Sequence, residues 1–210
     1  MPETNPAPRA HLVDLHVHTT PLSSDSVLSL EDSARHTVRL GLSALCLTEH
    51  NNMWTSAQVR GVAERWNISV IRGMEVGTDA GHVLVFGVEG FRPEMCNVHR
   101  LRRIVESEGA AMILAHPARE PATRPPLLEL PGLFHALEAL NGDENGVAAE
   151  LIAGMARSLG MPTTGGSDAH SPAALGRCAT RFSHPIRDER SLVEALRRGL
   201  CEAIQLQNPA

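Results

Sequence analysis

The stretch LEDSARHTVRLGLSALCLTEH, residues 30–50, contains the pattern on which the fold prediction rests. Its first twelve residues have the spacing of an amphipathic helix, and Gly41 supplies the left-handed residue that commonly ends one. Residues 42–50 then form a short apolar strand that runs into polar residues and ends at His50. A helix that leads directly into a buried strand is the repeating unit of an α/β fold.

The same helix-then-strand pattern recurs along the rest of the chain, with Gly or Asn at the end of each helix. The further pairs are 56–67 with 68–75, 98–109 with 110–117, 148–160 with 161–170, and 189–199 with 200–206. Two more apolar runs, 82–88 and 134–141, add strands. Ser29 and Asp188 are expected to be helix N-caps. The alternation predicts parallel pairing of about seven strands before a final one.

Length and continuity favour a single domain. Residues 1–10 are polar and rich in Pro, and we expect a flexible leader there, followed by one α/β domain over residues 11–206. Residues 118–132 contain several prolines and are expected to form a loop on the rim of this domain.

Composition excludes several classes of function. The net charge is -5, which argues against a non-specific grip on polynucleotide. All 19 basic residues are Arg, so chemistry that needs a Lys nucleophile is excluded. The 4 cysteines form no CxxC pair, and neither a signal peptide nor an apolar run of membrane-spanning length is evident. We therefore expect a cytoplasmic protein with reduced thiols and no membrane association.

Side chains that can bind metal gather where the predicted strands end. The first pair, His16 and His18 in DLHVHTT, would point to one face of a strand because strand side chains alternate. The candidates at carboxyl ends of strands are His16, His18, His50, Glu75, His116, Asp168 and His170. His82 is the exception, since it begins its strand. In α/β barrels the carboxyl ends of the strands form the rim that carries function.

With these motifs in their order, the chain resembles the PHP (polymerase and histidinol phosphatase) domain family of metal-dependent phosphoesterases. The resemblance rests on DLHVHTT, SSDS, LTEHN, GMEV, HVLVFG, AHP and GGSDAH, and it extends from about residue 11 to residue 205. It implies a distorted (β/α)7 TIM-like barrel, in agreement with the strand count. The family usually has Asp where this chain has Glu49, and we expect Glu49 to act outside the ligand set.

Carried over residue by residue, the resemblance implies three metal sites. The first would consist of His16, His18, Asp168 and one oxygen of Glu75. The second would consist of the other oxygen of Glu75, His82 and His116. The third would consist of Asp25, His50 and His170.

The implied chemistry is the hydrolysis of phosphomonoesters by a metal-bridging hydroxide, since two ions about 3.5–4 Å apart can clamp the attacking and leaving oxygens. Glu75 and Asp168 would act in catalysis as ligands that fix the ions. Imidazole mixed with carboxylate suits two or three ions of Zn, Mn or Fe better than Mg.

Three further residues are candidates for binding a small phosphorylated substrate. Arg119 lies three residues after His116 and could clamp two phosphoryl oxygens, which would place it in catalysis. Arg177 follows GGSDAH and is a second candidate cation. Asn141 could face the pocket from the end of its strand, although a role in the following turn is an equal alternative.

Three other functions compete with this one. A 3′–5′ exonuclease or phosphodiesterase acting on nucleic acid ends is disfavoured by the acidic charge and by an aromatic content of 3%. A non-catalytic metal-binding regulatory module is disfavoured because the ligand set is complete. Metal-assisted hydrolysis of an amide would need the same metal site, so only a comparison of substrates distinguishes it from phosphoester hydrolysis.

Overall fold

The structure is a computed structural model that describes residues 11–119, 124–144 and 146–206, so the expected leader at residues 1–10 lies outside it. Within these ranges, nine strands form one sheet. They are β1 (Leu12–Asp14), β2 (Ala44–His50), β3 (Ser69–Thr78), β4 (Gly81–Phe86), β5 (Ala111–Leu114), β6 (Ala136–Asn141), β7 (Thr163–Gly166), β8 (Cys178–Phe182) and β9 (Cys201–Gln205).

The sheet curves into a nearly closed barrel. Its strand order is β7-β6-β5-β4-β3-β2-β1-β8-β9, which leaves β7 at one edge. The gap is bridged because the hydroxyl of Thr180 on β8 donates to the carbonyl of Gly165 on β7 at 2.8 Å and accepts from its N–H at 2.9 Å. A Cβ at Gly165 would lie 2.5 Å from the carbonyl oxygen of Ala179. The approach of β7 to β8 therefore requires glycine at this position.

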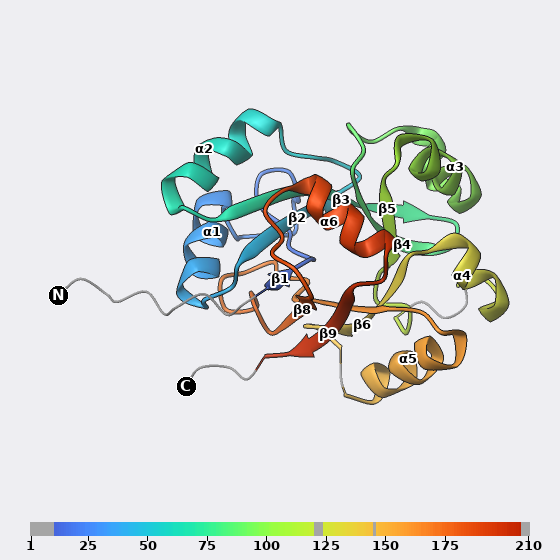
Figure 1. Ribbon diagram of the computed structural model, residues 1–210. Coiled ribbons are helices and arrows are strands. Elements are labelled where there is room, and N and C mark those ends of the chain that lie inside the picture. Colours follow the sequence, from blue (N-terminus) through green and yellow to red (C-terminus); the bar gives the residue numbers. More distant parts are fainter. Residues whose placement is uncertain (1–10, 120–123, 145, 207–210) are drawn as a thin grey trace.

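Helices cover the outside of the barrel and close one of its ends (Figure 1). The α-helices are α1 (Leu30–Arg39), α2 (Ser56–Trp66), α3 (Val98–Glu108), α4 (Leu130–Leu133), α5 (Gly146–Leu159) and α6 (Glu189–Arg197). Two single turns, η1 (Pro93–Cys96) and η2 (Leu127–Glu129), are 3-10 helices. No helix in the described ranges combines the length and the apolar character that a membrane crossing requires.

The helix ends follow the local sequence as expected. The side chain of Ser29 accepts the N–H of Asp32, and the side chain of Asp188 accepts the N–H of Ser191. The residues that follow the helices have a left-handed backbone, among them Gly41 with φ 68°. The predicted caps and helix ends are confirmed, and each satisfies backbone groups that a helix terminus leaves unpaired.

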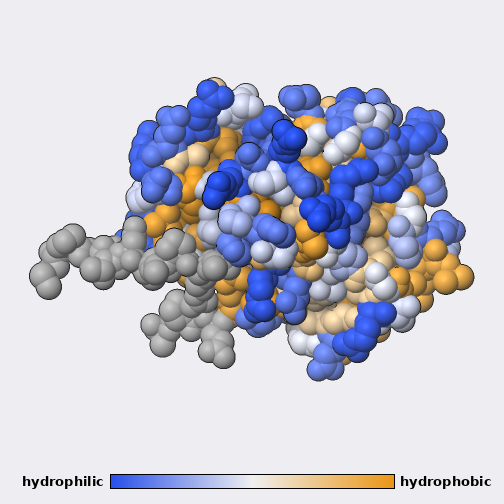
Figure 2. Space-filling view, viewed as in Figure 1, coloured by the Kyte–Doolittle hydropathy of each residue, from blue (hydrophilic) through white to orange (hydrophobic). Residues whose placement is uncertain are grey.

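Alternate side chains of the strands fill the barrel interior. Ala44 and Cys46 on β2 pack with Ile71 on β3 and with Phe86 on β4. Apolar residues of α6, such as Leu192, join this cluster and close the amino-terminal end of the barrel. Figure 2 shows that this face of the molecule is covered largely by hydrophilic side chains, with apolar residues between them. The packed end leaves the opposite rim for the polar residues.

Two sequence expectations on the strands were wrong in part. Pairing is not parallel throughout, because β4 runs antiparallel to both β3 and β5, and β8 runs antiparallel to β1 and β9. Strand β8 was not predicted, since no helix precedes it in the chain. Residues 118–132 are not loop throughout, because η2 and α4 begin within them, while residues 120–123 lie outside the described residues.

Candidate metal centre

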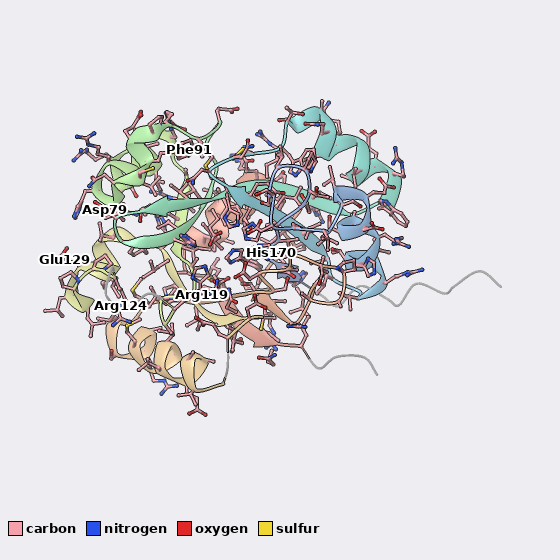
Figure 3. The ribbon with its side chains drawn as sticks, turned by 180° about the vertical axis from the view of Figure 1, so that it is seen from behind. Asp79, Phe91, Arg119, Arg124, Glu129 and His170 are labelled. Carbon is pink, nitrogen blue, oxygen red and sulfur yellow. The ribbon has the colours of Figure 1, made fainter. Side chains whose placement is uncertain are left out.

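The structure brings all nine predicted ligand residues to one rim of the barrel. His16 and His18 follow β1, and Asp25 lies in the loop between β1 and α1. The others lie in or directly after β2, β3, β4, β5 and β7: His50, Glu75, His82, His116, Asp168 and His170. Figure 3, turned by 180° from Figure 1, shows the molecule from the side of this rim, with His170 and Arg119 labelled on it.

The antiparallel direction of β4 explains why His82 lies at the start of its strand. Because β4 runs opposite to β3, its first residues lie at the same end of the barrel as the last residues of the parallel strands. Gly77 pairs with His82 and Glu75 pairs with Leu84, so the two candidate ligands lie close together along the β-hairpin. Nδ1 of His82 is 3.0 Å from Oε1 of Glu75.

Glu75 lies at the centre of the cluster, with an exposed fraction of only 2%. Its Oε1 lies 2.9 Å from Nε2 of His116, in addition to the contact with His82. Its Oε2 lies 2.9 Å from Nδ1 of His50 and 3.4 Å from Nε2 of His18. The two oxygens thus face two different groups of imidazoles, which is the arrangement that a bridging carboxylate needs.

A second group of donors adjoins Glu75. The Nε2 atoms of His16 and His18 lie 3.0 Å apart. Oδ1 of Asp168 is 3.3 Å from the first and 3.2 Å from the second. Nε2 of His16 is also 3.4 Å from Oε1 of Glu75. Nitrogen and oxygen donors that converge on one point from several segments match the donor set of a transition-metal ion.

The third group is more open to solvent. Oδ2 of Asp25 lies 3.1 Å from Nε2 of His50 and 3.4 Å from Nε2 of His170. The exposed fraction of the Asp25 side chain is 53% and that of His50 is 36%. The buried ring of His18 is stacked against those of His50 and His170, with centroids 4.2 Å and 4.4 Å away. Asp25, His50 and His170 form the solvent-facing side of the cluster.

Two candidate ligands have an uncommon backbone conformation. His116 has φ 27° and Asp168 has φ 51°, a region that non-glycine residues rarely adopt. Such residues concentrate at functional sites, where the surrounding structure holds them in place. Here the turn after β5 and the turn after β7 aim both side chains into the cluster.

The pKa values of the two buried imidazoles, His16 and His18, are shifted in opposite directions. Burial lowers the pKa of His16, but the carboxylates of Glu138, Asp168 and Glu75 outweigh it and hold that pKa well above its ordinary value. Burial lowers the pKa of His18 to about 4. Burial raises the pKa of Glu75 and Asp168, but neighbouring imidazoles, His16 foremost, bring both well below the usual range. The carboxylates are therefore ionised at neutral pH, and the site attracts cations.

Two of the predicted substrate residues adjoin this cluster. The guanidinium of Arg119 donates to Oδ2 of Asp168 at 3.0 Å and to Oδ1 of Asn141 at 3.2 Å. Asn141 is buried, and its Nδ2 lies 3.3 Å from the same Asp168 oxygen. Arg119 is 38% exposed, so it connects the buried carboxylate to solvent.

Arg177 lies beside the loop that follows β6. Its guanidinium is 3.4 Å from the carbonyl oxygen of Gly142 and 3.9 Å from Oδ1 of Asp143. Arg177 therefore contacts the two residues that directly follow Asn141 and makes neither of the contacts that Arg119 makes. Its role in substrate binding stays a prediction.

Two buried carboxylates beside the cluster were not predicted as site residues. Glu138 accepts from Nδ1 of His16 at 2.9 Å and from the N–H of His116 at 2.9 Å. The signal in the sequence was a lone carboxylate within the otherwise apolar run FHALEALN.

The second is Glu49, which the sequence placed outside the ligand set. Its carboxylate accepts from the N–H of Thr19 at 2.8 Å, from Nε1 of Trp54 at 2.9 Å and from the hydroxyl of Ser23 at 2.5 Å. The Ser23 hydroxyl lies 3.3 Å from Nδ1 of His18. Glu49 therefore ties the loop after β1 to the imidazole of His18.

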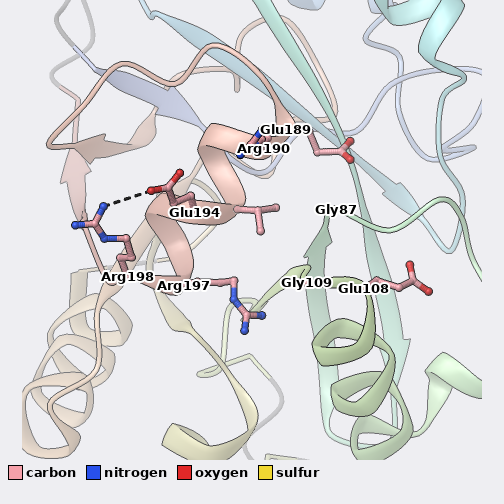
Figure 4. Close-up of a pocket in the computed structure, with 9 residues that line it drawn as sticks. Gly87, Glu108, Gly109, Glu189, Arg190, Glu194, Arg197 and Arg198 are labelled. Atoms are coloured by element: carbon pink, nitrogen blue, oxygen red, sulfur yellow. Dashed lines mark hydrogen bonds and ion pairs between the residues drawn. The ribbon is translucent and has the colours of Figure 1, made fainter.

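A separate hollow of about 510 Å³ lies between α3 and α6 (Figure 4). Gly109 lines it and lies two residues before the start of β5, whose far end leads to His116, so the hollow is at the opposite end of the barrel from the cluster. Its basic and acidic residues are mixed, and Arg198 pairs with Glu194 at 3.4 Å. The charges of the hollow compensate one another and do not extend the candidate site.

Comparison with known families identifies two matching models. The model described as PHP domain matches residues 14–147, and the model described as PHP-associated matches residues 146–201. Both matched regions contribute strands to the same sheet. No curated protein is significantly similar to the chain in sequence.

Solved structures share the fold at low sequence identity. PsfC from Pseudomonas syringae superposes with a TM-score of 0.73 at 20% identity, covering 93% of this chain and 91% of its own. A Bacteroides vulgatus two-domain protein, described as containing a predicted PHP-like metal-dependent phosphoesterase, gives 0.71 at 21% identity, covering 96% and 67%. The lesion-specific endonuclease PfuEndoQ from Pyrococcus furiosus gives 0.57 at 16% identity, covering 92% and 57%.

Proposed function

The chain belongs to the PHP domain family, and from that premise we propose that it is a metal-dependent phosphoesterase that hydrolyses small phosphomonoesters. The observation that carries the proposal is the position of Glu75, whose two oxygens face separate groups of imidazoles. A carboxylate of this kind can hold two cations at the short separation that phosphoryl transfer uses.

The donor atoms fit divalent transition metals. Among the residues that the structure describes, four groups of three each offer ligand atoms within 4.8 Å of one another. These groups are His16 with His18 and Glu75, His16 with His116 and Asp168, Glu75 with His82 and His116, and His18 with His50 and His170. Imidazole mixed with carboxylate is the set that Zn, Mn and Fe share, and we propose two or three such ions per chain.

Each residue has a definable part in the proposed reaction. When bound, divalent ions supply charge that neutralises the phosphoryl oxygens and a means of activating water near neutral pH. Glu75 and Asp168 hold the positions at which that charge is concentrated. Arg119 has N–H groups beyond the two that it donates to Asp168 and Asn141, and these can orient a phosphoryl group in two-point contact. Asn141 holds the guanidinium in place.

A small substrate is favoured over a nucleic acid. The exposed side of the cluster carries Asp25 and His50, and the chain has a net charge of -5 and an aromatic content of 3%. A polynucleotide groove typically combines basic residues with stacking rings.

The four free cysteines, Cys46, Cys96, Cys178 and Cys201, accord with a cytoplasmic location.

The experiment compares three chromogenic substrates with the purified protein in Mn²⁺ and in Zn²⁺: p-nitrophenyl phosphate, bis-p-nitrophenyl phosphate and an amide, p-nitroacetanilide. We expect the monoester to have the largest kcat/KM. Preference for the diester would overturn the monoester assignment in favour of a phosphodiesterase, and preference for the amide would overturn phosphoester hydrolysis.

Two variants separate the chain's own activity from a contaminant. Glu75→Gln removes the bridging charge with little change in volume, and kcat should fall on the order of 100-fold or more. Glu202→Gln removes an exposed carboxylate that pairs only loosely with Arg181 at 3.5 Å, and it should retain full activity. An active Glu75→Gln protein would refute the bridging role.

A further inference from the structure

Glu138 is a fully buried carboxylate whose oxygens all point at the candidate metal centre. Its exposed fraction is 0%, and it lies on β6, between apolar residues of the barrel. Oε1 is 2.9 Å from Nδ1 of His16, and Oε2 accepts from the N–H of His116 at 2.9 Å and from Nδ2 of Asn141 at 3.0 Å.

We propose that Glu138 is a positioning residue that fixes the orientation and tautomer of His16 and sets the turn that carries His116. It contacts the metal ligands rather than the metal. The inference rests on the proposed metal centre and adds a residue that the family motifs in the sequence did not supply.

The hydrogen bond to His16 decides which nitrogen is available to a metal. A carboxylate accepts and does not donate, so Nδ1 of His16 must carry the proton that it shares with Oε1 of Glu138. In the neutral ring, Nε2 is then the nitrogen that can offer a lone pair to a metal, on the side where Nε2 of His18 lies 3.0 Å away. A carboxylate behind a ligating imidazole fixes the ring and increases its basicity.

Gly166 provides independent support for a close and defined contact. It lies on β7 directly behind the pair, and a Cβ there would lie 2.8 Å from Oε1 of Glu138 and would collide with Cβ of His16. The second glycine of GGSDAH therefore makes room for the approach of the carboxylate to the imidazole. Any other residue at position 166 would displace Glu138 or His16.

The second oxygen extends the same control to the substrate side. Asn141 donates to Oε2 of Glu138, while its Oδ1 accepts from Arg119 at 3.2 Å. Burying an ionised carboxylate costs several kcal/mol of folding free energy unless hydrogen bonds compensate it. An apolar side chain would fill the same place in the barrel without this cost. Both oxygens of Glu138 instead meet donors that belong to the site.

The test is the affinity of the protein for Mn²⁺ and Zn²⁺, measured by competition with a chromogenic chelator. Glu138→Gln preserves the shape, but its amide NH₂ must face one of the donors that the carboxylate accepted, so one bond becomes a repulsion. We expect metal affinity to fall 10–100-fold. Activity should recover in part at high metal concentration.

Thr37→Val is the matched structural control. Thr37 is as buried as Glu138, but its hydroxyl donates within α1 to the carbonyl of Ser33 at 2.7 Å and touches none of the candidate ligands. This variant should melt at a lower temperature than the wild type and bind metal with unchanged affinity. If the control variant lost as much metal affinity as Glu138→Gln, a general loss of stability would be enough to explain the effect. That result would overturn the positioning role.

The outcomes separate this inference from the proposed function. If the wild type binds metal and Glu138→Gln binds it equally well, the positioning role is wrong while the metal centre stands. If the wild type binds no metal, the proposed function fails first. If Glu138→Gln does not fold, Glu138→Asp replaces it in the test, because it keeps the charge and has a shorter side chain. A metal affinity between that of the wild type and that of a His16→Ala variant supports the positioning role. Wild-type metal affinity in Glu138→Asp overturns it.

Discussion

Arg119 connects the buried part of the site to solvent. Its side chain is 38% exposed, and two of its N–H groups are engaged by Asp168 and Asn141. A guanidinium has five N–H donors in a planar fork, so others remain for a ligand. Because Asp168 and Asn141 fix the plane of the fork, little conformational freedom would be lost on binding of the proposed phosphoryl group.

Replacing Arg119 should therefore weaken substrate binding. We expect Arg119→Ala to raise KM for p-nitrophenyl phosphate about 10–100-fold, since a hydrogen bond to a charged group contributes about 1.5–3 kcal/mol. Arg119→Lys should recover only part of this, because an ammonium lacks the planar fork. Steady-state kinetics in saturating Mn²⁺ provide the measurement, with the exposed Arg181→Ala as the control. Unchanged KM in Arg119→Ala would exclude the phosphate contact.

At the level of elements, local sequence was enough to place most helices and strands. The cap at Ser29 and the left-handed residues such as Gly41 act over a few positions, so the chain itself records where each helix begins and ends. Direction was harder to predict. Strand β4 follows β3 through a tight turn and reverses, and only this reversal brings His82 to the rim.

The contacts behind the ligands could not be predicted from the sequence. Glu138 lies 122 positions from His16, and its partner atoms depend on the closure of the barrel. Glu49 contacts Thr19 and Trp54 through the strand register, which no local pattern encodes. The proposed ligand residues could be predicted because their motifs are short and continuous, whereas the carboxylates that contact them are single residues in largely apolar segments.

The largely buried imidazole of His135, directly before β6, should make the stability of the fold depend on pH. Burial, with Arg102 and Arg197 nearby, lowers its pKa to about 4. An imidazole in the unfolded chain titrates near 6.5, so the unfolded state binds an extra proton as the pH falls from about 6.5 to about 4, and the free energy of unfolding decreases over this range. Above pH 6.5 this contribution is fully present.

Urea denaturation of the metal-free protein at pH 7 and pH 5 tests the contribution of His135. We expect His135→Gln to reduce the loss of stability between these two values by about 2 kcal/mol. His184→Gln, which replaces an exposed imidazole, serves as the control. Equal pH dependence in the wild type and in His135→Gln would contradict the assignment.

The whole molecule separates the packing of the barrel from its chemistry. Apolar side chains and α6 fill the interior and close one end, while the proposed metal ligands, from His16 to His170, lie together at the other end. These ligands meet only when β7 has approached β8, since Asp168 and His170 follow β7. Metal binding should therefore stabilise the closed barrel, because ions that bind only the folded state shift the folding equilibrium.

The most direct test of the account is the metal content of the purified protein, determined by elemental analysis after saturation with Mn²⁺ or Zn²⁺ and removal of the excess. A cluster in which Glu75 bridges two sites predicts at least two ions per chain, and fewer in Glu75→Gln. One ion per chain or none in the wild type would contradict a multinuclear centre.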